Sequence, residues 1–286
     1  MFMRKHIFPC LLVLFCFLLC CSCNKKVTNG DDQHPWQSHH FPAASTSGKV
    51  ADYFNGGGIP DNAGMYLYDL NEGTMTRLVP GIAASGGVDF SPDGQWIVYS
   101  TGHRIYKYSL SDGSVILLAS DADYGYCCGP DWGPDGKKIA FDKGVGPERG
   151  IYLMDPNGDG QELKIPYGRY PSWGQDRIVF HKEKSGYIDI YSYDLDSDKE
   201  TRLTELLYAS EPSVSSVGIA FTYQEDNKMP QVWIMGLNGE NPHPLTSDGG
   251  CNPTWWGNQI IYVKPTKENG GLWTMSSNGS NKRPLL

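Results

Sequence analysis

The sequence predicts an all-β protein, a six-bladed β-propeller of four-stranded blades that follows an N-terminal signal peptide. The phrase DFSPDGQWIVYSTG, which begins at Asp89, returns about 40 residues later as DWGPDGKKIAFDKG, which begins at Asp131. A second phrase, typified by IYLMDP from Ile151, occurs six times at a similar spacing. Short strands repeated at this period are typical of propellers, in which each blade covers the apolar face of the next.

The first phrase supplies the two inner strands of a blade, the second phrase supplies the third strand, and a short stretch such as TRLT closes the blade. Turn signals separate the strands: in SPDG and GPDG, proline sets φ before the bend and glycine accepts the unusual φ after it. The segment from Phe41 to Phe54 is a degenerate first copy of the inner strands. In it we match Pro42 to Pro130 and Tyr53 to Phe141.

Alternating strand direction places the connections on two different rims. One rim carries minimal turns, and the other carries longer, irregular connections, where binding residues tend to lie. Tyrosine offers a large contact area at low entropic cost, so the tyrosines of the second rim are predicted binding residues. They are Tyr124, Tyr126, Tyr167, Tyr170, Tyr208 and Tyr223. The alternative is that these rings pack between blades and cap the loops.

The N-terminus has the pattern of an export signal. Arg4 and Lys5 precede an apolar run that is short for a membrane span. We divide the chain into a signal peptide (residues 1–22), a polar tether (23–40) and the propeller (41–286). LLCCSC resembles the lipoprotein box of bacteria, which implies lipidation at Cys23, with Cys21 as the alternative. Asn24 after the lipidated cysteine favours the outer membrane. An ordinary signal peptide or an uncleaved anchor would be the alternatives.

Composition narrows the classes of function. The net charge is −8, so no basic surface is expected that could neutralise phosphates, and nucleic acid is not an expected partner. Eight cysteines occur, but only Cys127, Cys128 and Cys251 lie in the propeller, which is no disulfide framework. A strained disulfide between Cys127 and Cys128 or a metal site can be imagined. Buried small thiols are the commoner explanation.

Other candidate chemistry is sparse, and we predict no catalytic residue, no metal site and no cofactor. His103 and His181 follow the second strands of two blades and lack a third histidine nearby. DPNGDGQE from Asp155 copies the first half of an EF-hand loop, but Pro166 stands where the closing glutamate belongs.

The repeat, (D/S)W-(S/G)-P-D-G-x-x-I-A-F followed by I-Y-x-M-D-x-x-G, resembles the WD40-like repeats of the TolB β-propeller family. Related repeats form the propellers of prolyl oligopeptidase-like enzymes, whose hydrolase domain has a G-x-S-x-G motif that is absent from this sequence. The resemblance implies a membrane-anchored envelope protein that binds or scaffolds a protein or peptide. Two alternatives remain, a propeller enzyme acting on oligosaccharides and a structural subunit of an envelope complex.

Overall fold

The computed structural model describes residues 39–54, 62–82, 86–121, 126–265 and 271–285. These residues form six antiparallel sheets, each built from four consecutive strands that we call A to D from the inside outward. The first three blades contain β1 (His39–Ala44), β2 (Lys49–Phe54), β3 (Gly64–Asp69) and β4 (Thr74–Pro80), then β5 (Val88–Phe90), β6 (Trp96–Thr101), β7 (Arg104–Ser109) and β8 (Val115–Ser120), then β9 (Cys127–Trp132), β10 (Ile139–Lys143), β11 (Gly150–Met154) and β12 (Glu162–Pro166).

The last three blades contain β13 (Gly168–Trp173), β14 (Arg177–Lys184), β15 (Tyr187–Asp194) and β16 (Lys199–Arg202), then β17 (Ala209–Val214), β18 (Ile219–Tyr223), β19 (Gln231–Met235) and β20 (His243–Pro244), then β21 (Cys251–Trp256), β22 (Gln259–Lys264), β23 (Gly271–Ser276) and β24 (Arg283–Pro284). The six-bladed propeller expected from the sequence is therefore confirmed. Its first strand begins at His39, two residues before the expected boundary.

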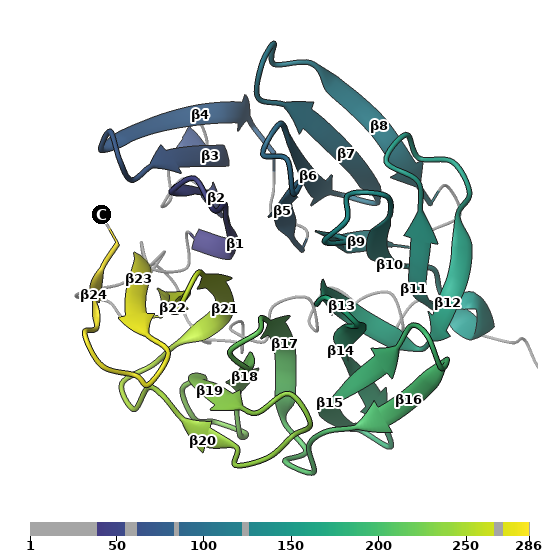
Figure 1. Cartoon of the computed structure of the whole chain (residues 1–286), viewed down its shortest axis with the longest axis vertical. Helices are drawn as coiled ribbons and strands as arrows, with labels where there is room; N and C mark the ends of the chain where they lie inside the picture. The colour runs from purple at the N-terminus through teal and green to yellow at the C-terminus, as the bar shows by residue number, and fades with distance from the viewer. Residues whose placement is uncertain (1–38, 55–61, 83–85, 122–125, 266–270, 286) are drawn as a thin grey trace, which may run out of the picture.

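The blades form a closed ring with the A strands around the axis (Figure 1). Because each sheet consists of consecutive strands, the first and last blades meet by side-chain packing and not by exchange of a strand. An apolar cluster that includes Val50, Tyr68, Cys251 and Ile261 lies at this junction. Five further clusters fill the other five junctions. The hydrophobic core is therefore shared between neighbouring blades, which explains why one blade could not fold alone.

The B strands carry the largest buried side chains. Ile139 and Phe141 face the second blade, while Ala140 between them faces the fourth, as the period of two along a strand requires. Equivalent aromatic residues, all nearly inaccessible to solvent, are Tyr99, Phe180, Phe221 and Tyr262. The aromatic residue that closes each apolar strand in the sequence is thus a wedge between two blades.

The first blade departs from this register. Pro42 takes the place of Pro130, as predicted. Tyr53 pairs with Met65, which is equivalent to Ile151, and Ile151 pairs with Asp142. Tyr53 is therefore equivalent to Asp142. The match of Tyr53 to Phe141 was therefore wrong by one residue. Asp52, fully buried, takes the position of the aromatic wedge, and Tyr53 instead faces the second blade. A degenerate repeat has no strong pattern to fix the register, so only pairing with the neighbouring strand decides it.

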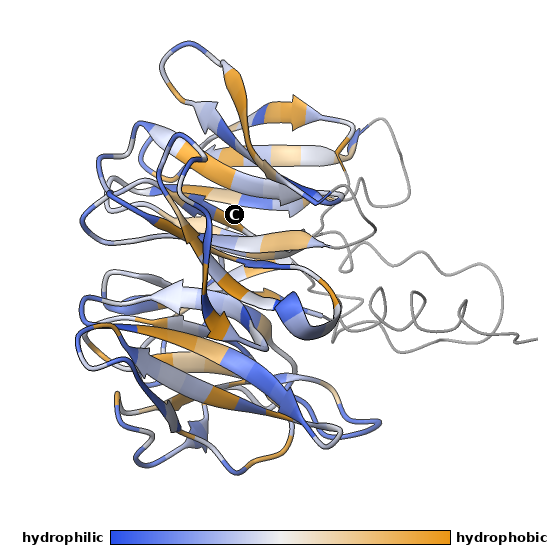
Figure 2. Ribbon diagram, turned by 90° about the vertical axis from the view of Figure 1, so that its right-hand side faces the viewer, coloured by the Kyte–Doolittle hydropathy of each residue, from blue (hydrophilic) through white to orange (hydrophobic). Residues whose placement is uncertain are grey.

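The two rims differ as the sequence suggested. The A–B and C–D turns are short and lie on one rim, which we call the tight-turn rim; Figure 2 shows their mostly hydrophilic residues along the left of the edge-on ring. The B–C and D–A connections form the opposite, long-loop rim. Within the described ranges, no helix has the length and apolar character needed to cross a membrane.

Candidate functional site

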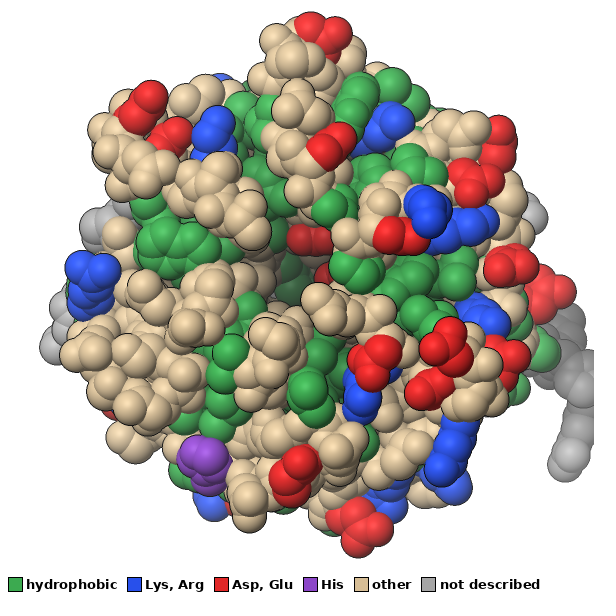
Figure 3. Space-filling view, in the orientation of Figure 1, with side chains coloured by type: hydrophobic (Ala, Val, Ile, Leu, Met, Phe, Trp, Pro, Cys, Tyr) green, Lys and Arg blue, Asp and Glu red, His purple; other side chains and the backbone are tan. Residues whose placement is uncertain are grey.

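A narrow channel runs along the axis of the ring. Three successive residues in or next to each A strand line it, and its volume is about 90 Å³. The lining residues are Phe41 to Ala43, Gly87 to Asp89, Gly129 to Asp131, Tyr170 to Ser172, Glu211 to Ser213 and Asn252 to Thr254. Figure 3 shows the hollow on the tight-turn rim, with acidic side chains inside it. The channel has room for a few water molecules but not for a folded segment.

The first lining position of the channel has an unusual backbone. Phe41, Tyr170, Glu211 and Asn252 all have φ near 50°, in the left-handed region, where side chains are rarely found. Gly129 occupies the same position in the third blade without this penalty. A bulge in the A strand accompanies the feature in each of these blades. Strained residues held in place at one mouth of a channel are a common mark of a functional site.

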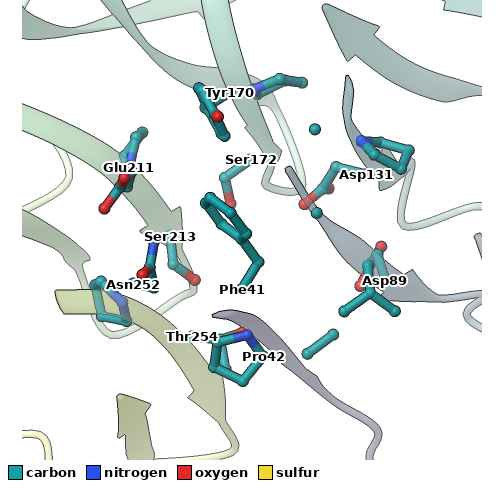
Figure 4. A pocket seen from close by; sticks show the side chains of 18 residues that line it. Phe41, Pro42, Asp89, Asp131, Tyr170, Ser172, Glu211, Ser213, Asn252 and Thr254 are labelled. Atoms are coloured by element: carbon teal, nitrogen blue, oxygen red, sulfur yellow. The ribbon is translucent and has the colours of Figure 1, made fainter. Parts of the chain in front are cut away.

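Phe41 lies across the channel at the end nearer the long-loop rim. Its ring stacks on that of Tyr170, with ring centroids 5.6 Å apart, and Tyr170 stacks in turn on His181 at 5.2 Å. Figure 4 shows Phe41 in the middle of the pocket, with Asp89 and Asp131 on one side and Asn252 on the other. The stack narrows the channel at this end.

Hydrogen bonds at the other end of the channel join successive blades. The backbone N–H of Trp132 donates to Asp89 Oδ2 (2.8 Å), and that of Trp173 donates to Asp131 Oδ1 (2.9 Å). Burial raises the pKa of Asp89 to about 7, and burial together with the nearby Asp89 raises the pKa of Asp131. The aspartate of the repeated DF or DW pair therefore links its blade to the next one, a role that a single repeat does not reveal.

A second set of links lies nearer the long-loop rim. The polar residue that follows the aromatic wedge in a B strand accepts a hydrogen bond from the left-handed residue of the next blade. Tyr170 N donates to Asp142 Oδ2 (3.2 Å), and Glu211 N donates to His181 Nδ1 (3.2 Å). Asn252 N likewise donates to the Thr222 hydroxyl (3.0 Å). The strained backbone is thus held by the preceding blade.

A charged cluster surrounds Asp142. Its carboxylate accepts a hydrogen bond from the Cys128 thiol (2.6 Å) and lies 3.6 Å from Arg169 Nε. The Arg169 guanidinium also lies over the rings of Tyr126 (4.7 Å) and Tyr170 (5.7 Å). Burial raises the pKa of Asp142, and Arg169 opposes that shift. These contacts bind the third and fourth blades together beneath the long-loop rim.

The predicted tyrosines do not form one surface. The structure joins Tyr126 and Tyr170 through Arg169, but Tyr170 is buried in the channel and is not the rim residue that we expected. Tyr208 packs edge-on against Tyr187, and Tyr223 packs on Trp233 and donates to Glu225 (2.9 Å). Tyr124 lies outside the described residues. These two packed pairs are closer to the alternative in which the tyrosine rings pack between blades and cap the loops.

Tyr167 is exposed, and it belongs to a larger apolar group on the same rim. This group, which we call the apolar arc, follows the connections of blades three to five. Its members are Val145, Tyr167, Tyr187, Leu207 and Met229, with exposed fractions from 36% to 49%. Tyr167 and Leu207 also have positive φ, at 63° and 72°. The predicted site contained only tyrosines and not the aliphatic members of the arc, although apolar residues in polar loops were a visible signal.

Several of the remaining candidates are buried or paired. Cys127, Cys128 and Cys251 are buried thiols that no disulfide joins, and Cys251 matches Cys128 in register. His181 is buried, and the Asp155 carboxylate pairs with Lys138 (2.9 Å). Across the described ranges, no three His, Cys, Asp or Glu side chains are grouped so that they could hold a metal ion. The predicted signal peptide, Cys23 and most of the predicted tether lie outside these ranges.

No family model matches the chain. An uncharacterised protein of Agrobacterium fabrum (strain C58) is 33% identical over 190 residues, which cover 61% of this chain and 64% of that protein. The Tol-Pal system protein TolB of Ruthia magnifica subsp. Calyptogena magnifica is 31% identical over 113 residues, covering 36% of this chain and 26% of that protein. The chain thus spans less than two thirds of either relative.

Two solved structures share the fold. The structure described as a putative TolB from Agrobacterium tumefaciens has a TM-score of 0.67 at 21% identity, covering 77% of this chain and 86% of that one. TolB from Acinetobacter baumannii has a TM-score of 0.69 at 20% identity, covering 84% and 63%. The chain is therefore a TolB-like six-bladed β-propeller in fold.

Proposed function

We propose that this TolB-like propeller is a non-catalytic binding or scaffold protein of the cell envelope, anchored to the outer membrane by a lipid on Cys23. Its partner is an envelope protein or peptide that docks on the long-loop rim. The apolar arc is the observation that carries the proposal. The name of the Ruthia relative, a Tol-Pal system protein, supports an envelope role by analogy.

The arc has the chemistry of a protein-binding surface. Its five side chains are apolar or aromatic, and they are exposed on connections of three adjacent blades. Burying such area contributes about 25 cal/mol per Å², so a partner that covers it gains affinity. Arg149 lies over the Tyr167 ring (5.3 Å) and Lys228 pairs with Glu225, which provides the polar border that interfaces usually have.

The polar residues near the channel support a binding role over a catalytic one. His181, Asp142 and Asp131 each accept a backbone hydrogen bond from the next blade. Side chains engaged in closing the ring are poorly placed to exchange protons or bind substrate. The same contacts make the scaffold rigid, and a rigid scaffold keeps the arc in place for a partner.

The chain path relates the arc to the proposed anchor. Strand β1 runs from the long-loop rim toward the tight turn at Ser45, so the chain enters the propeller on the side of the arc. Cys23 precedes His39 by 16 residues. The anchor would therefore turn the arc toward the membrane, and the partner would lie close to the membrane surface.

Site-specific photo-crosslinking in intact envelopes tests the proposal. A photoreactive residue at Tyr187 is expected to capture one dominant partner, identified by mass spectrometry. Val217 is the matched control, because it is 44% exposed against 46% for Tyr187 but lies on the tight-turn rim. Lysine cross-links from Lys143, Lys182, Lys184 and Lys228 should reach the same partner. Equal capture at both positions, or scattered products at Tyr187, would refute the proposal.

A further inference from the structure

The sixth blade has a polar pocket on the tight-turn rim. It lies between the A–B turn and the C–D turn of this blade and has a volume of about 670 Å³, within the usual range for small-molecule sites. Seven residues line it: Asn258, Gln259, Ser276, Ser277, Asn278, Asn281 and Arg283. We call this the blade-six pocket. Its lining contains amides, hydroxyls and one guanidinium, but no carboxylate and no apolar side chain.

This composition is specific to the sixth blade. The corresponding turns of the other five blades carry acidic residues. They are Asp69 and Glu72, Asp93 and Asp112, Asp135 and Asp155, Asp176 and Asp194, and Glu240. Lys282 and Arg283 add positive charge beside the pocket in a chain with a net charge of −8. In Figure 3 this part of the surface is mostly tan, the colour of the backbone and of side chains that are neither hydrophobic nor charged.

The hydrogen bonds within the pocket leave the amide nitrogens of Asn278 and Gln259 to face a ligand, whereas Asn281 Nδ2 already donates to the Ser276 hydroxyl (3.1 Å). Asn278 Oδ1 accepts from Ser280 N (3.0 Å) and from the Ser280 hydroxyl (2.6 Å). Gln259 Oε1 accepts from the Thr274 hydroxyl (3.2 Å). Both amide oxygens are therefore occupied, which fixes the amide orientations. Among the described residues, no acceptor pairs with the two amide nitrogens or with Arg283.

We propose that the blade-six pocket binds a saccharide that carries an oxyanion, either a carboxylate or a phosphate. The Arg283 guanidinium matches the geometry of an oxyanion and would hold it with two parallel hydrogen bonds. Asn278 and Gln259 donate to further ligand oxygens, and the Ser277 hydroxyl can both donate and accept, as sugar hydroxyls require. The absence of a lining carboxylate removes the repulsion that the turns of other blades would impose.

Isothermal titration of the full chain with four probes tests this site. The probes are galacturonic acid, glucose 6-phosphate, glucose and inorganic phosphate. We expect one or both of the charged sugars to bind at least tenfold more tightly than glucose and inorganic phosphate, and their order separates a carboxylate from a phosphate site. Glucose or inorganic phosphate binding equally well, or no binding by either charged sugar at millimolar concentration, would overturn the proposal.

Two variants connect binding to the pocket. Asn278→Asp keeps the oxygen that Ser280 uses but replaces the free donor with a negative charge, so we expect affinity to fall at least tenfold. Arg283→Gln, at an exposed position, should lower the affinity by the same factor. Asn238→Asp is the matched control, because Asn238 holds the same turn position in the fifth blade beside Arg177 (3.3 Å). Unchanged affinity in both pocket variants, or equal loss in the control, contradicts the proposal. The arc is not involved, so the proposed function is tested separately.

Discussion

Phe41 and Tyr170 stack across the axis of the propeller, with ring centroids 5.6 Å apart, although they belong to opposite blades of the ring. Both residues have φ near 50°, so each ring is held at some cost in backbone energy. The contact connects the most degenerate blade directly to the fourth blade. It therefore adds a link across the ring to those between neighbouring blades.

Phe41→Ala removes this cross-ring contact. Because Phe41 is only half-buried, we expect a loss of about 1–3 kcal/mol in the free energy of unfolding, below the 3–5 kcal/mol of a fully buried Phe. Urea denaturation measures it. Met75→Ala is the control, since Met75 is 62% exposed and should change stability by less than about 0.5 kcal/mol. Equal effects of the two substitutions would show that the stack contributes nothing.

Asp89→Asn tests the half-buried carboxyl in the channel. The folded pKa of Asp89 is raised to about 7, so the unfolded state loses this proton first and ionisation destabilises the fold between about pH 4 and pH 7. The asparagine oxygen can still accept from Trp132 N. We expect the melting temperature of the variant, relative to the parent, to be higher at pH 8 than at pH 4.5.

Asp93→Asn is the control for that titration. Hydrogen bonds from Ser91 and Gln95 N lower the pKa of Asp93, so its contribution is lost only as the pH falls below about 4. Its effect should be the same at pH 8 and pH 4.5. If the melting temperature of Asp89→Asn relative to the parent is the same at both pH values, the Asp89 carboxyl of the parent stays in one protonation state throughout.

His181→Gln tests the buried imidazole. Burial, and then Arg169, lower the pKa of His181 to about 3 from the ordinary 6.5. Between these values the unfolded state binds the extra proton, so the stability of the parent falls as the pH drops below 6.5. The variant should lose less stability than the parent between pH 7.5 and pH 5, even if it is less stable at pH 7.5. Parallel pH profiles from calorimetry would rule out this role.

Asp142→Ala should be among the most damaging substitutions. It leaves the Arg169 charge without its buried partner and removes the acceptor for Tyr170 N and Cys128, for a loss of about 3–5 kcal/mol in unfolding free energy. Arg169→Met and the double variant complete a thermodynamic cycle. A double variant no better than the sum of the two single losses would show that the pair is not coupled.

Leu207→Gly separates stability from binding. Leu207 has φ of 72°, so glycine relieves left-handed strain of roughly 1 kcal/mol, and the unfolded chain gains entropy that offsets part of it. The melting temperature should stay the same or rise, while partner capture at Tyr187 falls because an exposed apolar side chain is gone. A variant that melts lower but captures normally would argue for a purely structural Leu207.

The repeats allowed the fold to be predicted closely, because a period of about 40 residues with turn signals fits few architectures. The aromatic wedges such as Phe141 and Phe180 were visible for the same reason. The register of the first blade was not predicted, because Asp52 and Tyr53 obscure the repeat pattern. Their register depends on the pairing with β1 and β3. The binding surface was only partly predicted: Tyr167 lies in the arc, while Tyr170 is in the channel.

The sequence by itself determined the number of blades, the order of strands and the existence of two unlike rims, because these follow from local turn chemistry and alternating hydrophobicity. Only the tertiary structure decided which side chains meet between blades. Asp89 and Trp132, Asp142 and Arg169, and Phe41 and Tyr170 are far apart in sequence or belong to different repeats. Their contacts depend on how the closed ring places one blade against the next, and no single repeat contains that information.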